Sequence, residues 1–211
     1  MQIYTCNTSV HKKLNKIKAL GLGVLISTHA DITFAKSFLN QDIEGISLAL
    51  DNGAFANYKN GQPFNEYAFL WHLNQCIFKK VQLDFIVCPD IVAGGVKSLE
   101  FSLRWADRLN WNRLALVVQD GMTIDDIPED DRFSHIFVGG TVDWKWRTAG
   151  TWIKYAHEIG KKCHVGQCGT LSKINHCRDL GADSVDSTSF VRNDSFDIIE
   201  EHQNPKQMTL I

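Results

Sequence analysis

Residues 114–121 read Leu-Ala-Leu-Val-Val-Gln-Asp-Gly, an apolar run that ends in two polar residues and a glycine. Such a run, rich in apolar residues and closed by turn-forming ones, predicts a buried strand. The segment upstream, Val96–Leu109, places Leu99, Leu103 and Ala106 at three- and four-residue spacing, which predicts an amphipathic helix. A helix that leads into a buried strand is therefore the repeating unit to look for.

The same strand pattern recurs along the chain. The predicted strands are Ile3–Cys6, Val24–Thr28, Ser47–Leu50, Phe85–Cys88, Leu114–Val118, His135–Val138, Lys162–Val165 and Ser184–Asp186. The predicted helices between them include Glu66–Cys76, Val96–Leu109, Thr151–Gly160 and Leu171–Leu180. Eight strands that alternate with helices indicate a parallel sheet, and eight is the number that closes a (β/α)8 barrel of the TIM type. The same alternation also permits an open, doubly wound sheet.

Length and composition are those of one globular domain. The chain has 211 residues, of which 44% are hydrophobic and 22% charged. We assign residues 1–200 to the barrel and residues 201–211 to a polar C-terminal tail. The formal net charge of -2 gives no overall attraction for a polyanion, so a nucleic-acid partner needs a local basic patch.

The sequence shows no pattern for export or membrane insertion. Met1–Tyr4 enters a predicted strand directly, without a basic segment followed by an apolar one, and no apolar stretch is long enough to cross a bilayer. The six cysteines are scattered through a mid-sized chain and do not resemble the framework of a small secreted protein. We therefore expect a cytoplasmic protein with no membrane partner.

Polar residues and glycines follow most of the predicted strands. In chain order these strand ends are Asp51-Asn52-Gly53, Cys88-Pro89-Asp90, Gln119-Asp120-Gly121, Gly139-Gly140, Gly166-Gln167 and Asp186-Ser187-Thr188. In a barrel the carboxyl ends of the strands form one mouth, where catalytic residues lie. Each aspartate taken singly could equally be a helix N-cap, and the glycine pair could merely turn the chain. Together they predict one polar site.

Four of these segments resemble motifs of the tRNA-guanine transglycosylases. Residues 50–55 (Leu-Asp-Asn-Gly-Ala-Phe) resemble that family's D-S-G-G-F motif, and residues 117–121 (Val-Val-Gln-Asp-Gly) its V-Q-G-G. Residues 137–140 (Phe-Val-Gly-Gly) resemble its G-G turn, and the stretch 163–188 is similar to the one that runs from M-G-V-G to G-x-D-x-F-D-C. The order of the motifs is kept.

The resemblance implies base exchange on a nucleotide. Asp186 would be the nucleophile that attacks C1′ and displaces guanine, and Asp51 would be the general acid and base for the leaving and entering bases. Asp90 and Gln119 would hydrogen-bond the purine edge. The residues implied to bind the base are Asn52, Phe55, Asp90, Gln119, Gly139 and Gly140.

Three departures narrow the resemblance. No cysteine follows Cys177, so the family's zinc site is absent, and the adjacent Cys163 and His164 would point to opposite sides of a strand. We expect neither a metal nor another cofactor. Asn52 and Ala54 replace a serine and a glycine of the family. The chain is also much shorter than the tRNA enzymes, which favours the DpdA-like branch that modifies DNA in phages and bacteria; a phage-encoded protein would act in the bacterial host cell.

Contacts to a polymer are predicted beside the mouth. Lys145-Trp146-Arg147 combines cations with an aromatic ring, which suits single-stranded nucleic acid, and Arg192 follows Asp186 shortly. A Trp-anchored loop with a solvated basic rim would account for the same residues. To expose C1′, the target nucleotide must leave the stack or be single-stranded.

The sequence thus predicts an enzyme that replaces guanine in DNA by a free 7-deazaguanine base through a covalent sugar–aspartate intermediate, alone or with an accessory protein. Three alternatives stay open. The acceptor could be tRNA, the same site could hydrolyse the glycosidic bond, or the barrel could bind a base or nucleic acid without catalysis.

Overall fold

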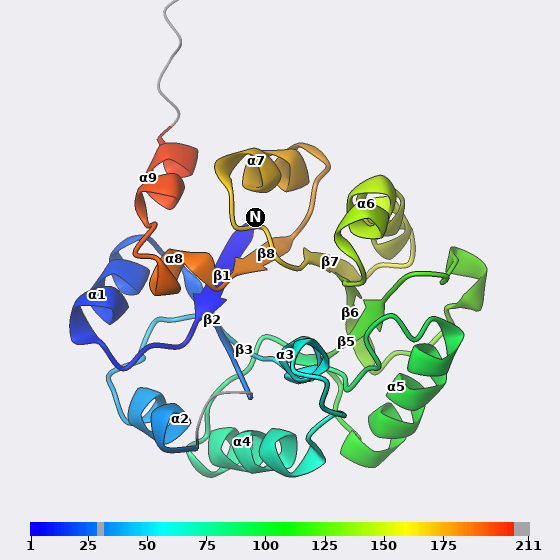
Figure 1. Cartoon of the computed structure of the whole chain (residues 1–211), viewed down its shortest axis with the longest axis horizontal. Coiled ribbons are helices and arrows are strands. Elements are labelled where there is room, and N and C mark those ends of the chain that lie inside the picture. Colours follow the sequence, from blue (N-terminus) through cyan, green and yellow to red (C-terminus); the bar gives the residue numbers. More distant parts are fainter. Residues whose placement is uncertain (29–31, 205–211) are drawn as a thin grey trace, which may run out of the picture.

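The chain forms a closed barrel of eight parallel strands in the order β1 to β8 (Figure 1). The computed structural model describes residues 1–28 and 32–204. The strands are β1 (Gln2–Cys6), β2 (Gly23–Ile26), β3 (Leu48–Leu50), β4 (Ile86–Val87), β5 (Leu114–Val118), β6 (Phe133–Val138), β7 (Lys162–Val165) and β8 (Ser184–Ser187). The pairing of Tyr4 on β1 with Asp186 on β8 belongs to the seam that closes the barrel. The predicted (β/α)8 barrel is confirmed, and the open sheet is excluded.

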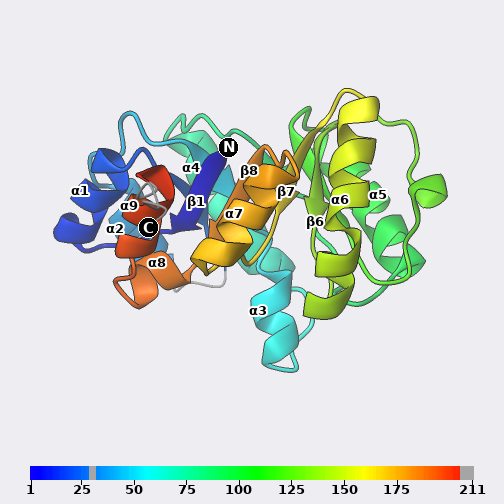
Figure 2. The same cartoon turned by 90° about the horizontal axis from the view of Figure 1, so that it is seen from above.

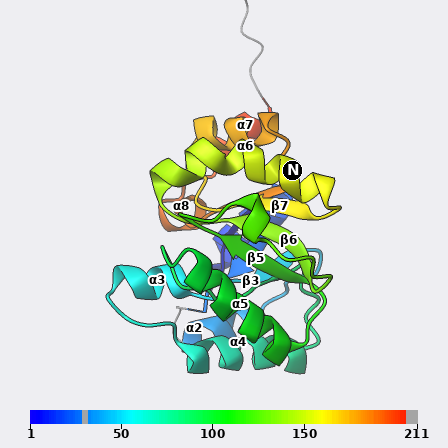
Figure 3. The same ribbon diagram turned by 90° about the vertical axis from the view of Figure 1, so that its right-hand side faces the viewer.

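Helices surround the strands as a ring in Figure 1. They are α1 (His11–Ala19), α2 (Ile32–Leu39), α3 (Ala54–Lys59), α4 (Glu66–Phe78), α5 (Val96–Leu109), α6 (Val142–Glu158), α7 (Leu171–Asp179), α8 (Ser189–Arg192) and α9 (Asp197–Gln203), with a 3-10 turn η1 (Ile124–Asp126). Helix α3 differs from the others because it projects beyond one end of the barrel (Figures 2 and 3). Within the described residues no helix has both the length and the apolar character needed to span a membrane.

Two apolar layers hold the barrel together, because successive residues of a strand point to opposite faces. The outward-facing residues of the strands pack against the helices in one continuous core. The inward-facing residues fill the barrel axis, and they are Tyr4, Leu25, Ala49, Phe85, Val87, Ala115 and Val117, with Phe137 packed against them. The axis is therefore a packed core, and in the described part of the chain a cavity lies at each end of the barrel.

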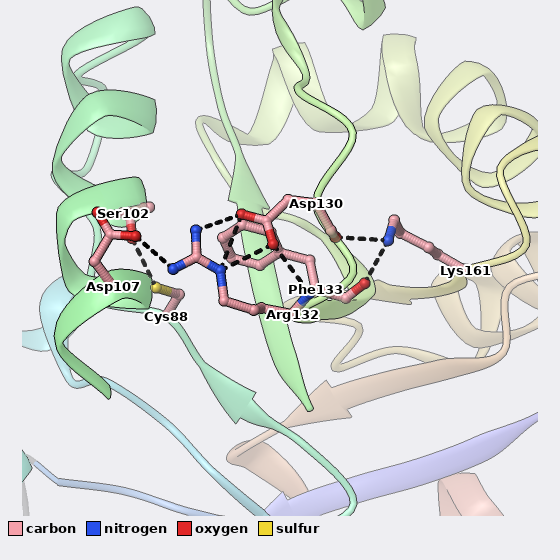
Figure 4. A network of polar contacts seen from close by, with 7 residues as sticks. All are labelled: Cys88, Ser102, Asp107, Asp130, Arg132, Phe133 and Lys161. Carbon is pink, nitrogen blue, oxygen red and sulfur yellow. Dashed lines mark hydrogen bonds and ion pairs between the residues drawn. The ribbon is translucent and has the colours of Figure 1, made fainter. Parts of the chain in front are cut away.

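A charged network ties the loops together where β6 and β7 begin (Figure 4). The guanidinium of Arg132 binds Asp130 through Nε at 2.9 Å and Nη2 at 2.6 Å, while Nη1 reaches Asp107 of α5 at 2.5 Å. Lys161 donates from Nζ to the carbonyl oxygens of Asp130 and Phe133, at 2.9 and 2.7 Å. This network joins α5, the β5–β6 loop and the start of β7.

The main correction to the predicted elements concerns α6. It begins at Val142 and not at the predicted Thr151, so Lys145-Trp146-Arg147 lies on a helix and not on a loop. Helix α6 starts early because Thr141, just before it, donates from its backbone N and its Oγ1 to the carboxylate of Asp120, at 2.7 and 2.5 Å. This long-range contact leaves no local signal in the sequence.

The C-terminal boundary also moves. Helix α9 runs to Gln203, past the predicted end of the barrel at residue 200. Ile199 is fully buried, and the ring Nδ1 of His202 lies 2.8 Å from Oδ1 of Asn175 on α7. The rest of the predicted tail, residues 205–211, lies outside the described residues. The observed strand ends lie within two residues of the predicted ones.

Candidate active site

A cavity of about 450 Å³ opens at the carboxyl ends of the strands, a size suited to a small organic ligand. It brings together ten of the predicted site residues, which are Asp51, Asn52, Phe55, Asp90, Gln119, Gly139, Gly140, Lys145, Asp186 and Arg192. Trp146 and Arg147 do not line it. The cavity therefore collects side chains from loops that are far apart in the sequence.

The two-residue period of the strands explains why several of these side chains meet. Ala49 and Val117 face the barrel interior, so Asp51 and Gln119, two positions further along, continue on the same inward face beyond the strand ends. Asp186 lies near the end of β8 and is 14% exposed. Parallel strands end at the same side, so their inward residues converge on the axis.

A larger cavity of about 790 Å³ lies at the opposite end of the barrel. Its charged lining mixes signs, with Arg113 and Lys162 beside Asp84 and Asp183. Catalytic groups of TIM barrels come from the carboxyl ends of the strands, so the smaller cavity is the candidate active site.

Asp51 is a carboxyl group that can hold a proton near neutral pH. Burial raises its pKa, and the negative charge of Asp186 raises it further, to about 6, although the backbone N–H groups of Gly53 and Asn52 act to lower it. The Asn52 N–H lies 2.9 Å from Oδ1. Asp51 is therefore poised between its acid and its carboxylate form.

Asp90 is buried on the cavity floor and held by two amide side chains. Nδ2 of Asn52 donates to Oδ1 at 2.6 Å and to the carbonyl oxygen of Cys88 at 2.9 Å, while Nε2 of Gln119 donates to Oδ2. Burial raises the pKa of Asp90 to about 7; the hydrogen bonds from Asn52 and Gln119 oppose the rise, and the charge of Asp51 adds to it. Asn52 lines the cavity and orients Asp90; its predicted contact with the base stays a prediction.

Gln119 keeps a free acceptor. Its Nε2 also donates to Oγ of Ser98 at 3.2 Å, which fixes the amide, whereas its buried Oε1 has no hydrogen-bond partner among the described residues. A buried carbonyl oxygen without a partner is costly, so a ligand N–H at this position would be stabilising. Together Gln119 and Asp90 present acceptor atoms to a ligand that carries N–H groups.

Asp186 is held by contacts that the sequence did not reveal. Its Oδ1 lies 3.0 Å from Nε2 of His164 and 3.3 Å from the backbone N of Gln167, whose positive φ of 65° is unusual for a residue other than glycine. Lys145 is buried nearby and donates from Nζ to the carbonyl oxygen of Gly166 at 2.8 Å. Burial lowers the pKa of Lys145, and the charge of Asp186 acts to raise it.

The glycine pair Gly139-Gly140 is required by packing. A Cβ on Gly139 would lie 2.8 Å from Cγ1 of Val117, and one on Gly140, where φ is +73°, would lie 2.5 Å from Oδ2 of Asp120. Only glycine fits at this turn. The backbone of the pair consequently borders the cavity at close range.

Cations stand around the rim. Lys59 of α3 lies with its Nζ 5.5 Å from the ring of Phe55, which is 41% exposed, and Lys173 and Arg192 line the other side from α7 and α8. Neither Lys59 nor Lys173 was predicted, because nothing in the local sequence marks them. The rim is positive, whereas the floor carries the carboxylates.

The three residues of α6 that were predicted to bind a polymer lie in different environments. Lys145 is buried within the cavity. Trp146 is half-buried, with Nζ of Lys173 5.3 Å from its ring, and Arg147 is exposed and donates to the carbonyl oxygen of Asp143 at 3.3 Å. Contact of Trp146 or Arg147 with nucleic acid stays a prediction.

The cysteines carry free thiols. In the described part of the chain, no group of three or more His, Cys, Asp or Glu side chains is placed to hold a metal ion. Cys163 packs in the core between strands and helices, whereas His164 faces the barrel interior.

No protein-family model matches this chain, and no curated protein matches it either.

Proposed function

We propose that this protein is a base-exchange enzyme that replaces guanine in a nucleic acid, with DNA as the favoured acceptor, by a free 7-deazaguanine base. The observation that carries the proposal is the pair Asp51 and Asp186 in one cavity. Their environments differ, because burial favours a proton on Asp51, whereas His164 and a backbone N–H hydrogen-bond Asp186. A buried carboxyl group that can hold a proton suits the acid–base role, and a carboxylate held by hydrogen bonds at the cavity suits the nucleophilic role.

The proposed reaction has two displacements. A carboxylate oxygen of Asp186 attacks C1′, the C1′–N9 bond breaks, and its electron pair goes to guanine N9 as Asp51 transfers its proton there. The incoming base then gives its N–H proton to the Asp51 carboxylate and attacks C1′, which releases Asp186. Asp51 returns to its acid form, so protons balance over the cycle.

The floor of the cavity suits the edge of guanine. Guanine and its 7-deaza relatives present N–H donors at N1 and N2, and Asp90 with Gln119 offers a carboxylate and a free carbonyl oxygen. The backbone of Gly139 and Gly140 lines the same cavity, where it would meet the carbonyl oxygen of the base. Phe55 lies at the rim, where its exposed ring can stack on a base.

The positive rim supports a polymer acceptor. Lys59, Lys173 and Arg192 surround the opening, where phosphates on either side of a target nucleotide would lie. The carboxylates lie below this rim, so the nucleotide must enter flipped out of a duplex or from a single strand. This polarity also favours a nucleic acid over a free neutral nucleoside.

The test is incorporation of radiolabelled guanine into a polymer. Purified protein is incubated with labelled guanine and, separately, with single-stranded DNA, duplex DNA and tRNA. The variants are Asp186→Asn and a matched control, Asp179→Asn, which changes an exposed aspartate on α7. We expect label to enter DNA with the wild type and the control, and not with Asp186→Asn, which keeps its affinity for guanine.

Each other result has a defined meaning. If label enters tRNA alone, the protein is a base-exchange enzyme whose acceptor is tRNA and not DNA. Release of guanine from the polymer without any uptake of label identifies a glycosidase that uses the same carboxylates. Guanine binding with no exchange and no release in the folded wild type overturns the proposal and leaves a base-binding barrel.

A further inference from the structure

His164 on β7 is buried in the barrel axis between aromatic rings. Its imidazole stacks on Phe137, with the centroids 4.4 Å apart and the rings inclined by 28°. The rings of Tyr4 and Phe85 lie 5.9 and 5.4 Å away at steeper angles. The side chain is fully buried, so packing on these rings fixes the plane of the imidazole.

Both ring nitrogens of His164 make hydrogen bonds along the barrel axis. Nε2 lies 3.0 Å from Oδ1 of Asp186, and Nδ1 lies 2.8 Å from Oγ of Ser184 on the same strand as Asp186. A carboxylate can only accept, so Nε2 carries a proton. In the neutral ring Nδ1 then accepts from the Ser184 hydroxyl, which selects the Nε2–H tautomer.

The contacts of Asp186 are one-sided. Oδ1 receives the Nε2–H of His164 and, at 3.3 Å, the backbone N–H of Gln167. Oδ2 accepts no hydrogen bond from residues 1–28 or 32–204. One oxygen is therefore anchored to the barrel, and the other is left unoccupied in a side chain that lines the cavity.

We propose that His164 is a positioning residue that anchors Oδ1 of Asp186 and so presents Oδ2 for attack on C1′, with Ser184 setting its tautomer. The proposal rests on the proposed function, in which Asp186 is the nucleophile. A carboxylate free to rotate spends part of its time with neither oxygen aimed at the sugar. Small misplacements of a reacting group cost large factors in rate, so an anchor of this kind has its effect on the chemical step and not on base binding.

A first measurement tests the anchor without any turnover. ¹⁵N-labelled histidine in the whole protein reports the tautomer of each ring by NMR. We expect a protonated Nε2 and an unprotonated Nδ1 for His164, with the Nε2 signal displaced in Asp186→Asn and unmoved in Asp179→Asn. A Nδ1–H tautomer of His164, or an Nε2 signal that does not change in Asp186→Asn, contradicts the proposed hydrogen bond between the two residues.

A second measurement tests its effect on the reaction. The rate of covalent adduct formation with single-stranded DNA and the Kd for guanine are compared in His164→Gln, whose amide N–H can replace the donor, and His164→Leu, which has none. We expect guanine Kd within about twofold of wild type in both, and an adduct rate about 100-fold lower in His164→Leu but less than about tenfold lower in His164→Gln.

The outcomes separate the two proposals. No adduct in the wild type overturns the proposed function, whatever the NMR spectrum shows. An adduct that forms as fast in His164→Leu as in the wild type overturns only the role of His164. Equal losses in the Gln and Leu variants, accompanied by weaker guanine binding, also overturn it, because they indicate a purely structural residue.

Discussion

The amide nitrogen of Asn52 lies 2.6 Å from Oδ1 of Asp90, so a residue that follows β3 stabilises the charged form of a carboxyl group that follows β4. Without partners, burial would favour the neutral form of Asp90 more strongly. The hydrogen bond from Asn52 opposes this effect, and the pKa of Asp90 is raised only to about 7. The charge of this carboxyl group near neutral pH therefore reflects burial, which favours the neutral form, and the hydrogen bonds from Asn52 and Gln119, which favour the carboxylate.

Affinity for a 7-deazaguanine base should increase as pH rises through about 7, because the Asp90 carboxylate accepts an N–H of the base edge more strongly than the neutral acid does. Asn52→Ala removes a contact that lowers the pKa of Asp90. The midpoint of the rise in base affinity with pH should therefore move to higher pH, and the affinity at pH 7 should fall roughly tenfold. Calorimetric titrations between pH 6 and 8 measure both. Asn112→Ala, at an exposed position, is the control; an unchanged midpoint in Asn52→Ala contradicts the assignment.

Asp51→Asn should stabilise the protein at pH 8. The folded pKa of Asp51 is raised from 3.8 to about 6, so the folded state binds its proton more tightly than the unfolded state does, and stability falls as pH rises from about 4 to 6. The asparagine variant does not lose this stability, so at pH 8 it should be more stable by roughly 1–3 kcal/mol, or about 2–12 °C in Tm, and the gain should shrink toward pH 4. Thermal unfolding at pH 5 and pH 8 checks this. A lower Tm for Asp51→Asn than for the wild type at pH 8 contradicts this prediction. Base exchange should be lost in the variant whatever its stability.

Binding of single-stranded DNA should depend on salt through the rim. Lys173→Gln and Arg192→Gln should each reduce the slope of log affinity against log salt by about one, because each removes one phosphate contact. Arg178→Gln, near the C-terminal end of α7 and paired with Asp179, makes the same charge change away from the cavity and should leave the slope unchanged. Fluorescence anisotropy with a labelled oligonucleotide measures these slopes. Arg147→Gln in the same series tests the nucleic-acid contact that the sequence predicts for this residue. Identical slopes in all variants contradict phosphate binding by the rim cations.

Arg132→Met should destabilise the fold and spare the site. The variant leaves the carboxylate of Asp130, 12% exposed, without its guanidinium partner, at a cost of about 1–3 kcal/mol or roughly 2–12 °C in Tm. Lys154→Met breaks only an exposed pair with Glu158 and should change stability by less than about 0.5 kcal/mol. Chemical denaturation measures both, and guanine Kd should be unchanged. A loss of guanine binding in folded Arg132→Met contradicts the separation between the network and the site.

Local periodicity was sufficient to predict the barrel and much of the mouth. The β-branched runs and the polar residues that follow them are short-range features, and parallel strands necessarily end on one side, so Asp51, Gln119 and Asp186 could be placed together before the structure was known. The start of α6 could not be predicted, because the Asp120 contact that stabilises it comes from another loop.

The eight alternating units and the residue types at the strand ends could be read from short segments, because both depend on residues that are close together in the chain. The hydrogen-bond partners appear only in the folded barrel: Asn52 orients Asp90, Lys145 is buried beside Gly166, and His164 on β7 contacts Asp186 on the neighbouring strand β8. The physical reason is that hydrogen-bond partners and burial depend on distances between segments far apart in the chain, and these distances are fixed only when the strands close into a barrel.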